Sequence, residues 1–360
     1  MNRNWWRSML GVSTVLVLVL AACSTGTGEA TATPDASTDA ESDAPASMAD
    51  GGTAVEGFVS IHGSSTVEPI STIVAEDFAA ANDGFDYEVG GEGTGDGFGN
   101  FFCPGTSDIS DASRPIKDEE AQTCADNGVD FVELKVGYDG ITVLTSPEND
   151  AVSCLSFLDL YALLGPESEG FDNWTDANDL AAELEAELGG DYGATNAPYP
   201  DAALDITAPG EESGTFDTFV ELVIAKIAEA RGTDGTTRAD YTASANDNVI
   251  VEGIEGSPTS LGWVGYAFYE ENQDLLKAIE VDGGDGCTAV SNESISDGSY
   301  PLSRPLFIYP NTGKLADNPA LAPFVDYYLN DGYGSVSEAG YVALPDDELE
   351  ATKTAWAEAQ

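Results

Sequence analysis

The chain has 360 residues, and its 12 lysines and arginines against 65 aspartates and glutamates give a formal net charge of −53. So negative a chain does not suit nucleic acid as a partner, because binding a polyanion requires clustered cationic side chains. With 42% apolar residues it can bury a large core, which excludes wholesale disorder. The length indicates two domains of roughly 100–200 residues each, and the acidity is typical of proteins that stay soluble in strong salt.

The N-terminal residues indicate export. The apolar run over residues 9–21 is shorter than the roughly 20 residues that span a bilayer, so residues 1–22 are predicted to be a signal peptide. The Leu-Ala-Ala-Cys sequence that ends at Cys23 resembles the bacterial lipobox, which implies cleavage before this cysteine and a diacylglyceryl group on its sulfur. We therefore expect an extracytoplasmic protein that is lipid-anchored to the cell membrane, in the periplasm or at the cell surface. An uncleaved anchor or plain secretion is the alternative.

Residues 23–56 are rich in Thr, Ala, Ser, Gly, Pro, Asp and Glu, and they include no aromatic residue. Such a composition cannot bury enough apolar surface to order a chain. This segment is therefore predicted to be a disordered acidic tether, with the folded body beginning at Gly57.

Four cysteines remain if the first carries lipid: Cys103, Cys124, Cys154 and Cys287. An even number outside the reducing cytoplasm predicts two disulfides. We prefer the pairs Cys103–Cys124 and Cys154–Cys287, because the first closes a short loop around one helix; the other two connectivities stay open. The chain has no Cys-x-x-Cys and a single histidine, His62, so neither a zinc site nor another metal or cofactor is predicted.

The body alternates β-like runs with amphipathic helical stretches, which predicts α/β layers with mostly parallel sheets. Strands are predicted over 55–62, 85–89, 131–136, 141–145, 202–207, 260–266, 278–281 and 306–309. Helices, recognised by apolar residues that recur on one face, are predicted over 69–81, 155–164, 215–230, 320–330 and 348–358, with another starting near Ile116.

Four segments place Gly, Ser or Thr at the start of a predicted helix: residues 63–66, 91–98, 111–115 and 210–215. A helix N-terminus leaves backbone N–H groups unpaired and carries about half a positive charge. Hydroxyls add donors, and glycine lets the backbone come close to a ligand. Together these groups suit a small oxyanion such as phosphate.

Simple N-capping explains each of these segments taken alone. The glycine-rich segment 91–98 lacks the third glycine of a dinucleotide fingerprint, and the chain has no Gly-Lys-Ser/Thr of a P-loop. Four such helix starts on one chain favour the oxyanion interpretation.

The chain also resembles a known family, the phosphate-binding lipoproteins of Pst-type ABC importers. The resemblance rests on the ordered segments GSSTVEP, GEGTGDGF, DISDASRPIKDEE, VGYDGITVL, ESGTFDTF, NDNVIVEGI, LGWVGYAFYEEN and SRPLFIYP, and it covers roughly residues 57–330. It implies a type II periplasmic-binding-protein fold, in which two α/β lobes joined by two chain crossings close over one phosphate. It also implies a monomer that delivers phosphate to a membrane ABC permease and is not an enzyme. We expect residues 57–140 in the first lobe, 141–258 in the second, and 259–360 in the first again with the C-terminal helices.

The resemblance assigns phosphate contacts to three loops of this chain. The matching residues are Ser65 and Thr66 in the first loop, Thr94 in the Gly-rich loop, and Ser213, Gly214 and Thr215 in the third.

Two positions depart from the family's pattern. Members place an arginine four residues before the Ser-Gly-Thr serine, where this chain has Pro209. They also place an aspartate and then a small residue where this chain has Ser113 and Arg114. We hypothesise that Arg114 supplies the missing charge, because a guanidinium fork suits two phosphate oxygens. A surface ion pair is the alternative role for Arg114.

The missing aspartate bears on selectivity. Phosphate near neutral pH retains a proton and sulfate does not, so a carboxylate acceptor favours phosphate and repels sulfate. We favour Asp139, which lies at the expected crossing between the lobes. Asp111, Asp96 and Glu92 are alternative acceptors, and a solvated surface role is open for each.

Other functions account for less of the sequence. A secreted phosphatase could use Ser213 with His62, but no Gly-x-Ser-x-Gly elbow occurs and no spacing supports a triad. A role as an adhesion or structural lipoprotein does not explain the four segments that place Gly, Ser or Thr at the start of a helix. The Asp-rich stretch 282–286 lacks the residue order of an EF-hand loop. Sulfate, molybdate and arsenate stay open as alternative ligands.

Overall fold

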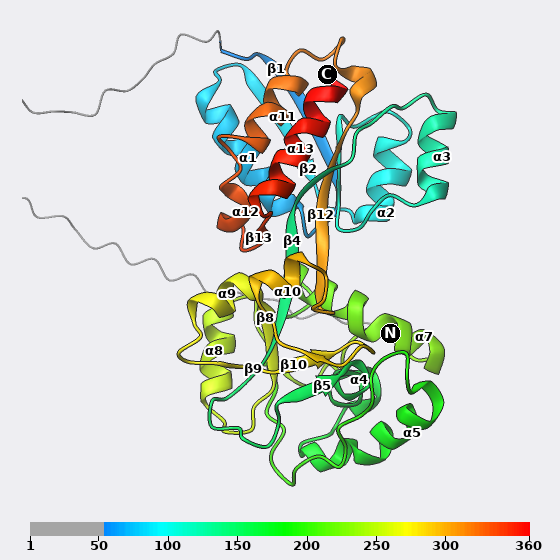
Figure 1. Ribbon diagram of the computed structural model, residues 1–360, viewed down its shortest axis with the longest axis vertical. Coiled ribbons are helices and arrows are strands. Elements are labelled where there is room, and N and C mark those ends of the chain that lie inside the picture. The colour runs from blue at the N-terminus through cyan, green and yellow to red at the C-terminus, as the bar shows by residue number, and fades with distance from the viewer. Residues whose placement is uncertain (1–53) are drawn as a thin grey trace, which may run out of the picture. The chain divides into compact units, whose positions relative to one another are not determined.

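Two antiparallel strands, β4 (Leu134–Thr145) and β12 (Ser303–Pro310), connect the two lobes of the protein. The computed structural model describes residues 54–360. β4 belongs to both lobes: up to Gly140 it pairs with β12, and from Ile141 it pairs with β8 (Gly262–Gly265). Figure 1 shows β4 and β12 side by side where the chain passes between the lobes.

Several predictions concern residues outside the described part of the chain. These are the signal peptide over 1–22, the lipidated Cys23 and nearly all of the tether over 23–56. Within residues 54–360, no helix combines the length and apolar character needed to cross a membrane.

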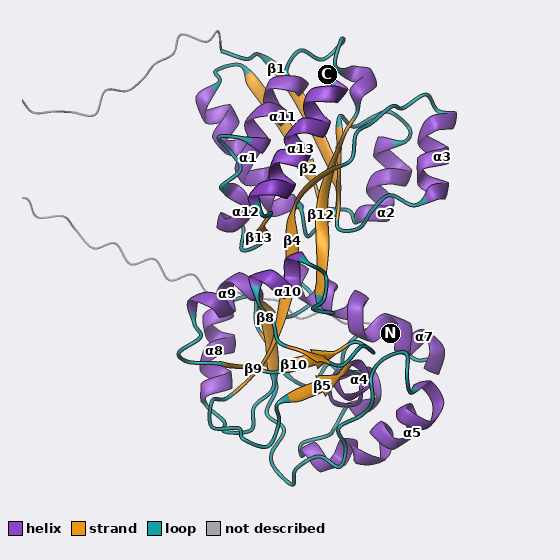
Figure 2. Cartoon of the chain, viewed as in Figure 1, coloured by secondary structure: helices purple, strands orange, loops and turns teal. Residues whose placement is uncertain are grey.

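The first lobe is a mixed sheet flanked by helices (Figure 2). The strand order is β13-β4-β12-β3-β1-β2, with the β1 pairs parallel and the pairs of β12 and β13 antiparallel. The prediction of mostly parallel sheets is therefore wrong for this lobe. Besides β4 and β12 its elements are β1 (Gly57–Gly63), α1 (Glu68–Ala81), β2 (Phe85–Gly90), α2 (Thr94–Asp96), the π-helix η1 (Gly97–Phe102), β3 (Ile109–Ala112), α3 (Asp118–Asp126), the 3-10 helix η5 (Thr312–Lys314), α11 (Leu321–Leu329), α12 (Ser335–Glu338), β13 (Val342–Ala343) and α13 (Asp346–Ala359).

Helix α1 shows how the sequence builds this lobe. Ile70, Val74 and Phe78 recur every four residues, so they lie on one face of the helix and are buried. The ring of Phe78 packs edge-on against Phe324 of α11, with the ring centres 5.5 Å apart. The amphipathic pattern therefore fixes the rotation of α1, and with it the direction of the loop before its first turn.

The second lobe begins in the second half of β4 and contains shorter strands. The strands form small sheets: β4 pairs with β8 and β9, β10 lies between β5 and β11, and β6 pairs with β7. Besides β8 its elements are β5 (Cys154–Ser156), α4 (Phe157–Leu164), the 3-10 helices η2 (Pro166–Ser168) and η3 (Trp174–Ala177), α5 (Asn178–Leu188), β6 (Thr207–Ala208), α6 (Gly214–Phe219), the π-helix η4 (Val220–Ile224), α7 (Ala225–Arg231), β7 (Thr242–Ala243), α8 (Asp247–Glu255), α9 (Tyr266–Glu271), β9 (Lys277–Ala278), β10 (Glu280–Asp282), β11 (Cys287–Thr288) and α10 (Asn292–Ser296).

The second chain crossing lies later than the sequence predicted. Residues 259–302 were expected in the first lobe, but β8 pairs with the second half of β4, and Trp263 and Val281 pack in one core cluster with Leu158. The return crossing is at the start of β12, where the Ile141 amide donates to the carbonyl of Leu302. Residues 141–302 therefore form the second lobe.

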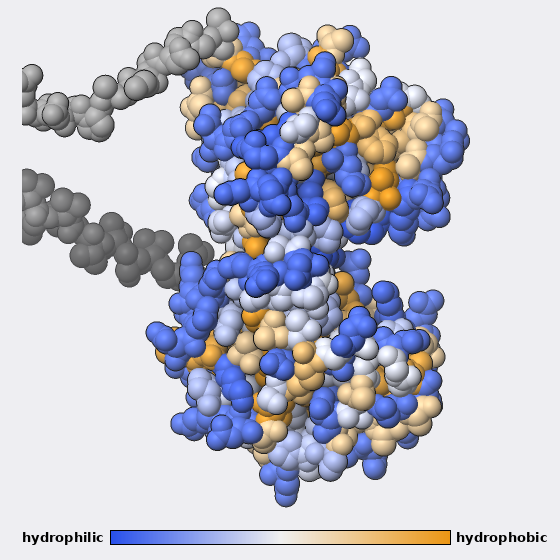
Figure 3. Space-filling model, in the orientation of Figure 1, coloured by the Kyte–Doolittle hydropathy of each residue, from blue (hydrophilic) through white to orange (hydrophobic). Residues whose placement is uncertain are grey.

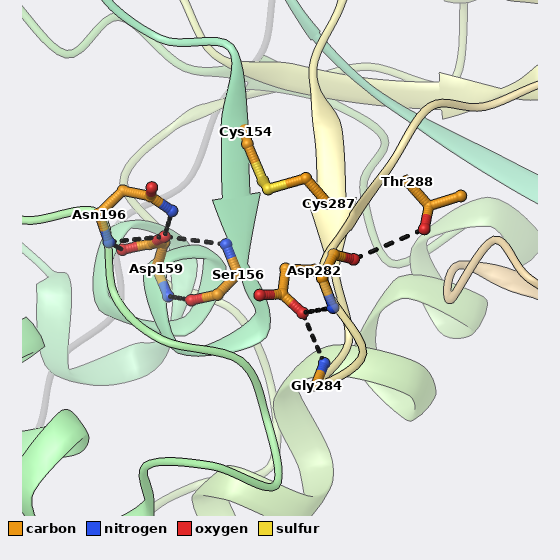
Figure 4. The surroundings of a disulfide bond; sticks show 9 residues. Cys154, Ser156, Asp159, Asn196, Asp282, Gly284, Cys287 and Thr288 are labelled. Carbon is orange, nitrogen blue, oxygen red and sulfur yellow. Dashed lines mark hydrogen bonds between the residues drawn. A yellow bond between two sulfur atoms is a disulfide. The ribbon is translucent and has the colours of Figure 1, made fainter.

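Both predicted disulfides are present. Cys103 bonds to Cys124 in the first lobe, and Cys154 bonds to Cys287 in the second. Figure 4 shows the second bond joining β5 to β11, beside the buried Asp159. The Asp-rich stretch next to it is an ordinary turn, in which Asp282 accepts hydrogen bonds from the amides of Gly284 and Gly286.

Some predicted elements have different bounds. The strands predicted over 131–136 and 141–145 are one strand, β4. The helix predicted over 155–164 begins at Phe157, and α3, predicted to start near Ile116, begins two residues later at Asp118. The helix predicted over 215–230 is the continuous run of α6, η4 and α7. Of the strand predicted over 202–207 only Thr207 lies in a strand, β6, while Ala203 and Ile206 form isolated β-bridges.

The surface agrees with the acidic composition. Figure 3 shows hydrophilic residues over most of the face in view, with apolar residues scattered among them. Among the described residues the large exposed apolar side chains are Phe58, Val249 and Leu275, which lie far apart in the sequence.

Candidate functional site

The loop between β1 and α1 is held by the neighbouring strand β3. Gly63 has a φ of +148°, and a Cβ atom there would lie 2.1 Å from the carbonyl oxygen of Asp111, so only glycine fits. The amide of Ser64 donates to that same carbonyl at 2.9 Å. α1 has no side-chain N-cap. The hydroxyls of Ser65 and Thr66 are therefore not used for capping, contrary to the simple alternative.

The second and third predicted segments meet beside this loop. The amide of Gly93 donates to the carbonyl of Gly63 at 2.7 Å. Thr94, at the start of α2, accepts a hydrogen bond from the amide of Ser113 at 3.1 Å, and the two hydroxyl oxygens are 3.2 Å apart. Ser113 is buried, whereas Thr94 is half-buried. Three of the four predicted segments thus form one cluster in the first lobe.

The fourth segment approaches the cluster from the second lobe. Ser213 caps α6, accepting from the amide of Thr215 at 3.2 Å, so the N-cap alternative holds for this hydroxyl. A Cβ atom on Gly214 would lie 3.8 Å from both the Ser65 carbonyl oxygen and the Thr66 Cα. The start of α6 therefore faces the start of α1 across the junction of the lobes.

The guanidinium group of Arg114 is not free to bind a ligand at this junction. Its two terminal nitrogens bind the two carboxylate oxygens of Glu120 at 2.8 and 2.7 Å. The hydrogen bonds that the guanidinium donates to Glu120 raise its pKa above the usual value. Glu120 also accepts from the amide of Lys117 at the start of α3. This geometry favours the ion-pair role that the sequence left as the alternative.

Arg304 of β12 is a buried cation that the sequence analysis missed. Its Nη2 donates to Thr66 Oγ1 at 2.9 Å and also contacts Thr218 of α6. Its Nη1 binds Glu221 at 2.5 Å, and its Nε lies 3.4 Å from Asp139 Oδ2. Arg304 thus touches both lobes directly behind the loops that face each other. The signal was present in the SRPLFIYP segment, which contains one of only 12 lysines and arginines in the chain.

Asp139 is buried beside Arg304, at the crossing where it was predicted. It accepts from Thr218 Oγ1 at 2.8 Å. Burial raises the pKa of its carboxyl, while Arg304 and Thr218 counteract that rise. The same Thr218 hydroxyl lies 2.9 Å from the carbonyl oxygen of Gly214, so its single hydrogen is shared between the two acceptors and ties this carboxylate to the fourth segment.

The other candidate acceptors have different surroundings. Asp96 is exposed, where it accepts from Asn100, and Glu92 pairs with His62 at 2.9 Å. Asp111 is fully buried beneath the first loop, where Ser71 donates to it at 3.0 Å. The histidine ring stacks on Phe101 with ring centres 4.1 Å apart, so this residue has a structural role beside the loop.

A cleft of about 280 Å³ opens next to Asp139 and Thr215. Its lining adds the carboxylates of Asp247, Glu271 and Glu338 and the half-buried ring of Tyr341. Burial raises the pKa of the Tyr341 hydroxyl, and Asp139 adds to the rise. Its negative lining makes the cleft itself a poor anion site, so the groups that suit an anion lie at the facing helix starts.

Comparison with known proteins shows to which family this chain belongs. The model of the PBP superfamily domain matches residues 27–331. Protein SphX from Synechocystis is 39% identical over 80% of this chain and 79% of its own length. The phosphate-binding protein PstS from Staphylococcus saprophyticus is 36% identical over 81% of each chain. This chain belongs to the PstS/SphX family of the PBP superfamily.

A solved structure agrees with this assignment. A possible phosphate-binding protein from Planctomyces limnophilus matches with a TM-score of 0.73 and 32% identity, covering 85% of this chain and 99% of that one. The predicted two-lobed α/β fold of a periplasmic binding protein is therefore confirmed. The PstS/SphX family consists of substrate-binding proteins and not of enzymes.

Proposed function

We propose that this PstS/SphX family member binds inorganic phosphate outside the cytoplasm and delivers it to an ABC-type phosphate import permease. The observation that carries the proposal is the meeting of helix starts from both lobes, with Gly214 of α6 facing Ser65 and Thr66 before α1. Unpaired amides and hydroxyls at such positions stabilise a tetrahedral anion. PstS and the Planctomyces limnophilus protein, both named for phosphate binding, match this chain over most of its length.

The proposed ligand contacts come from both lobes. They are Ser65, Thr66, Thr94, Ser113, Ser213, Gly214 and Thr215, with Arg114, Arg304 and Asp139 providing the charged surroundings. These donors act at short range in a partly buried site, whereas most of the surface carboxylates are distant and screened by salt. The strongly negative net charge is therefore compatible with an anionic ligand.

Asp139 provides a route to selectivity. A buried carboxylate accepts the proton that phosphate retains, whereas sulfate has none to donate and is repelled. Sulfate, molybdate and arsenate are the competing ligands. The response to Asp139→Asn separates sulfate and molybdate, which carry no proton near neutral pH, from phosphate; arsenate retains a proton as phosphate does and is compared by direct titration. Loss of the carboxylate should narrow the difference in affinity between phosphate and sulfate.

Calorimetric titration of the purified protein in about 1 M NaCl tests the proposal, because surface charges are screened within ~3 Å there. We expect one phosphate per chain and much weaker sulfate binding. Ser65→Ala should weaken phosphate binding by about 1.5–3 kcal/mol, the contribution of a hydrogen bond to a charged group. Ser299→Ala, which removes an exposed hydroxyl in the second lobe, is the matched control. No heat with any tetrahedral oxyanion would refute the function.

The lipid anchor at Cys23 is a further part of the proposal and is supported by the sequence alone. Fractionation of cells that express the protein tests it. The wild type should sediment with the membrane, and Cys23→Ala should be released from it. Equal membrane association of both forms would contradict lipidation.

A further inference from the structure

Arg304 is paired with two carboxylates that differ sharply in burial. The side chain of Asp139 is 5% exposed, and that of Glu221 is 58% exposed. Asp139 is also the cross-strand partner of Arg304 in the β4–β12 ladder, so it is fixed by the backbone. Glu221 lies on η4 of the second lobe and reaches Arg304 with a long, largely solvated side chain. Only Glu221 can leave the guanidinium by a simple rotation into water.

The position of Glu221 places a negative charge beside the proposed ligand loops. Arg304 donates through Nη2 to Thr66, a residue of the first loop, and through Nη1 to Glu221. The pKa of the Arg114 guanidinium is raised mainly by Glu120, and the charge of Glu221 on the opposite lobe adds to the rise. One arginine with two carboxylates carries a net charge of −1, which opposes an arriving phosphate. Without Glu221 the buried pair is neutral.

We propose that Arg304 is the cationic positioning residue of the phosphate site and that Glu221 is a resident carboxylate that competes with phosphate for it. This inference rests on the proposed function. Arg304 holds the first loop through Thr66 and helix α6 through Thr218, whose hydroxyl also lies within hydrogen-bond distance of the carbonyl of Gly214. Phosphate at the facing helix starts displaces Glu221, and a freed Nη1 then faces the anion, as a guanidinium does with oxyanions. Glu221 thereby lowers affinity and favours release.

The first test compares Glu221→Gln with Glu229→Gln in calorimetric titrations with inorganic phosphate at low salt. Glu229 is an exposed carboxylate on α7, within the same helical run, so both variants remove one charge from it. Glu221→Gln should tighten phosphate binding roughly fivefold, in line with a partly exposed ion pair. Glu229→Gln should change it less than twofold. Equal effects of the two variants, or no gain from Glu221→Gln, would overturn the inference.

A double-mutant cycle shows whether Glu221 acts through Arg304. Arg304→Gln should weaken phosphate binding by more than about tenfold, because a charge-assisted contact is lost. In that background Glu221→Gln should bring no further gain. A gain in phosphate affinity that persists in this background would mean that Glu221 acts only as a general negative charge. The proposal that Glu221 competes with phosphate for Arg304 would then be wrong.

Removing Arg304 leaves the Asp139 carboxylate buried without its cation, which can destabilise the fold. The experiment therefore needs a control for folding. Thermal unfolding is measured for every variant, and the same cycle is repeated in the Asp139→Asn background, where no buried charge is orphaned. Arg304→Lys, which keeps the charge but not the fork, should restore only part of the affinity. Wild-type protein that binds no tetrahedral oxyanion would refute the proposed function itself. A binding wild type whose Arg304 variants keep full affinity would refute only this inference.

Discussion

Arg304 and Asp139 face each other across the antiparallel ladder of β12 and β4, with Nε 3.4 Å from Oδ2. Both side chains are buried, and both lie where the chain passes between the lobes. An isolated buried charge is strongly destabilising, so each of the two requires the other. Arg304 also contacts Thr66 of the first lobe and Thr218 of the second, so the pair lies where the two lobes meet.

Gly63→Ala should destabilise the protein. The new Cβ atom would lie 2.1 Å from the Asp111 carbonyl oxygen, at a φ of +148° that side chains rarely adopt. We expect a loss of at least about 2 kcal/mol in the free energy of unfolding, measured by urea denaturation. Gly99→Ala is the control, because a Cβ atom there meets nothing within 4 Å. Equal stability of the two variants would show that the loop relaxes freely.

Asp111 should make stability depend on pH. Burial raises the pKa of its carboxyl to about 8, with the Ser71 hydrogen bond opposing the rise and Glu68 adding to it. Because the folded pKa lies above the ordinary 3.8, the stabilisation is full below about pH 4 and is lost as the pH rises to about 8. One oxygen of Asp111 has no hydrogen-bond partner among the described residues, which agrees with a protonated acid.

Asp111→Asn should therefore gain stability over the wild type as the pH rises, by about 1.4 kcal/mol per pH unit between about pH 5 and 8. Urea unfolding at constant salt, at several pH values, measures the difference. Asp96→Asn, which changes an exposed carboxylate, should leave the pH dependence of stability unchanged. Parallel pH curves for the wild type and Asp111→Asn would rule out a buried neutral acid.

The elements that follow local patterns were predictable from the sequence. The amphipathic period placed α1 almost to the residue, and the spacing of the cysteines favoured the pairs that form. The sequence predicts two strands where the structure has the single strand β4, because Gly137 and Gly140 interrupt the apolar run. In the structure these glycines give room to neighbours: a Cβ on Gly137 would lie 3.0 Å from the carbonyl oxygen of Val342, and one on Gly140 would lie 2.5 Å from Ile295. Such packing depends on residues far away in the sequence.

The same distinction applies to the site. Helix starts carry a local signature, so the four glycine-hydroxyl segments could be found without a structure. The importance of Arg304 depends on its register opposite Asp139 and on a contact with Thr66, 238 residues away in the chain. No local pattern encodes that pairing. The sequence therefore directed attention to Arg114, the arginine adjacent to a recognisable loop.

Salt should accelerate phosphate association. With a net charge of −53 the protein repels a dianion at long range, and raising NaCl from about 0.1 M to about 1 M shortens the screening length from ~10 to ~3 Å. Stopped-flow tryptophan fluorescence should show association rates that rise over this range. The same series with an uncharged osmolyte controls for viscosity and water activity. Rates that fall with added salt would indicate a locally positive path to the site.

Arg114 and Arg304 are the two candidates for the positive charge of the site, and we expect their substitution to weaken phosphate binding to different extents. Glu120 occupies both terminal nitrogens of Arg114, so Arg114→Gln should weaken phosphate binding less than about threefold, the effect of a screened surface charge. Arg304→Gln should cost more than about tenfold. Both variants remove one positive charge, and calorimetric titration at the same salt concentration compares them directly. If Arg114→Gln proves the more harmful, the guanidinium leaves Glu120 when phosphate binds, and the loop after β3 carries the charge.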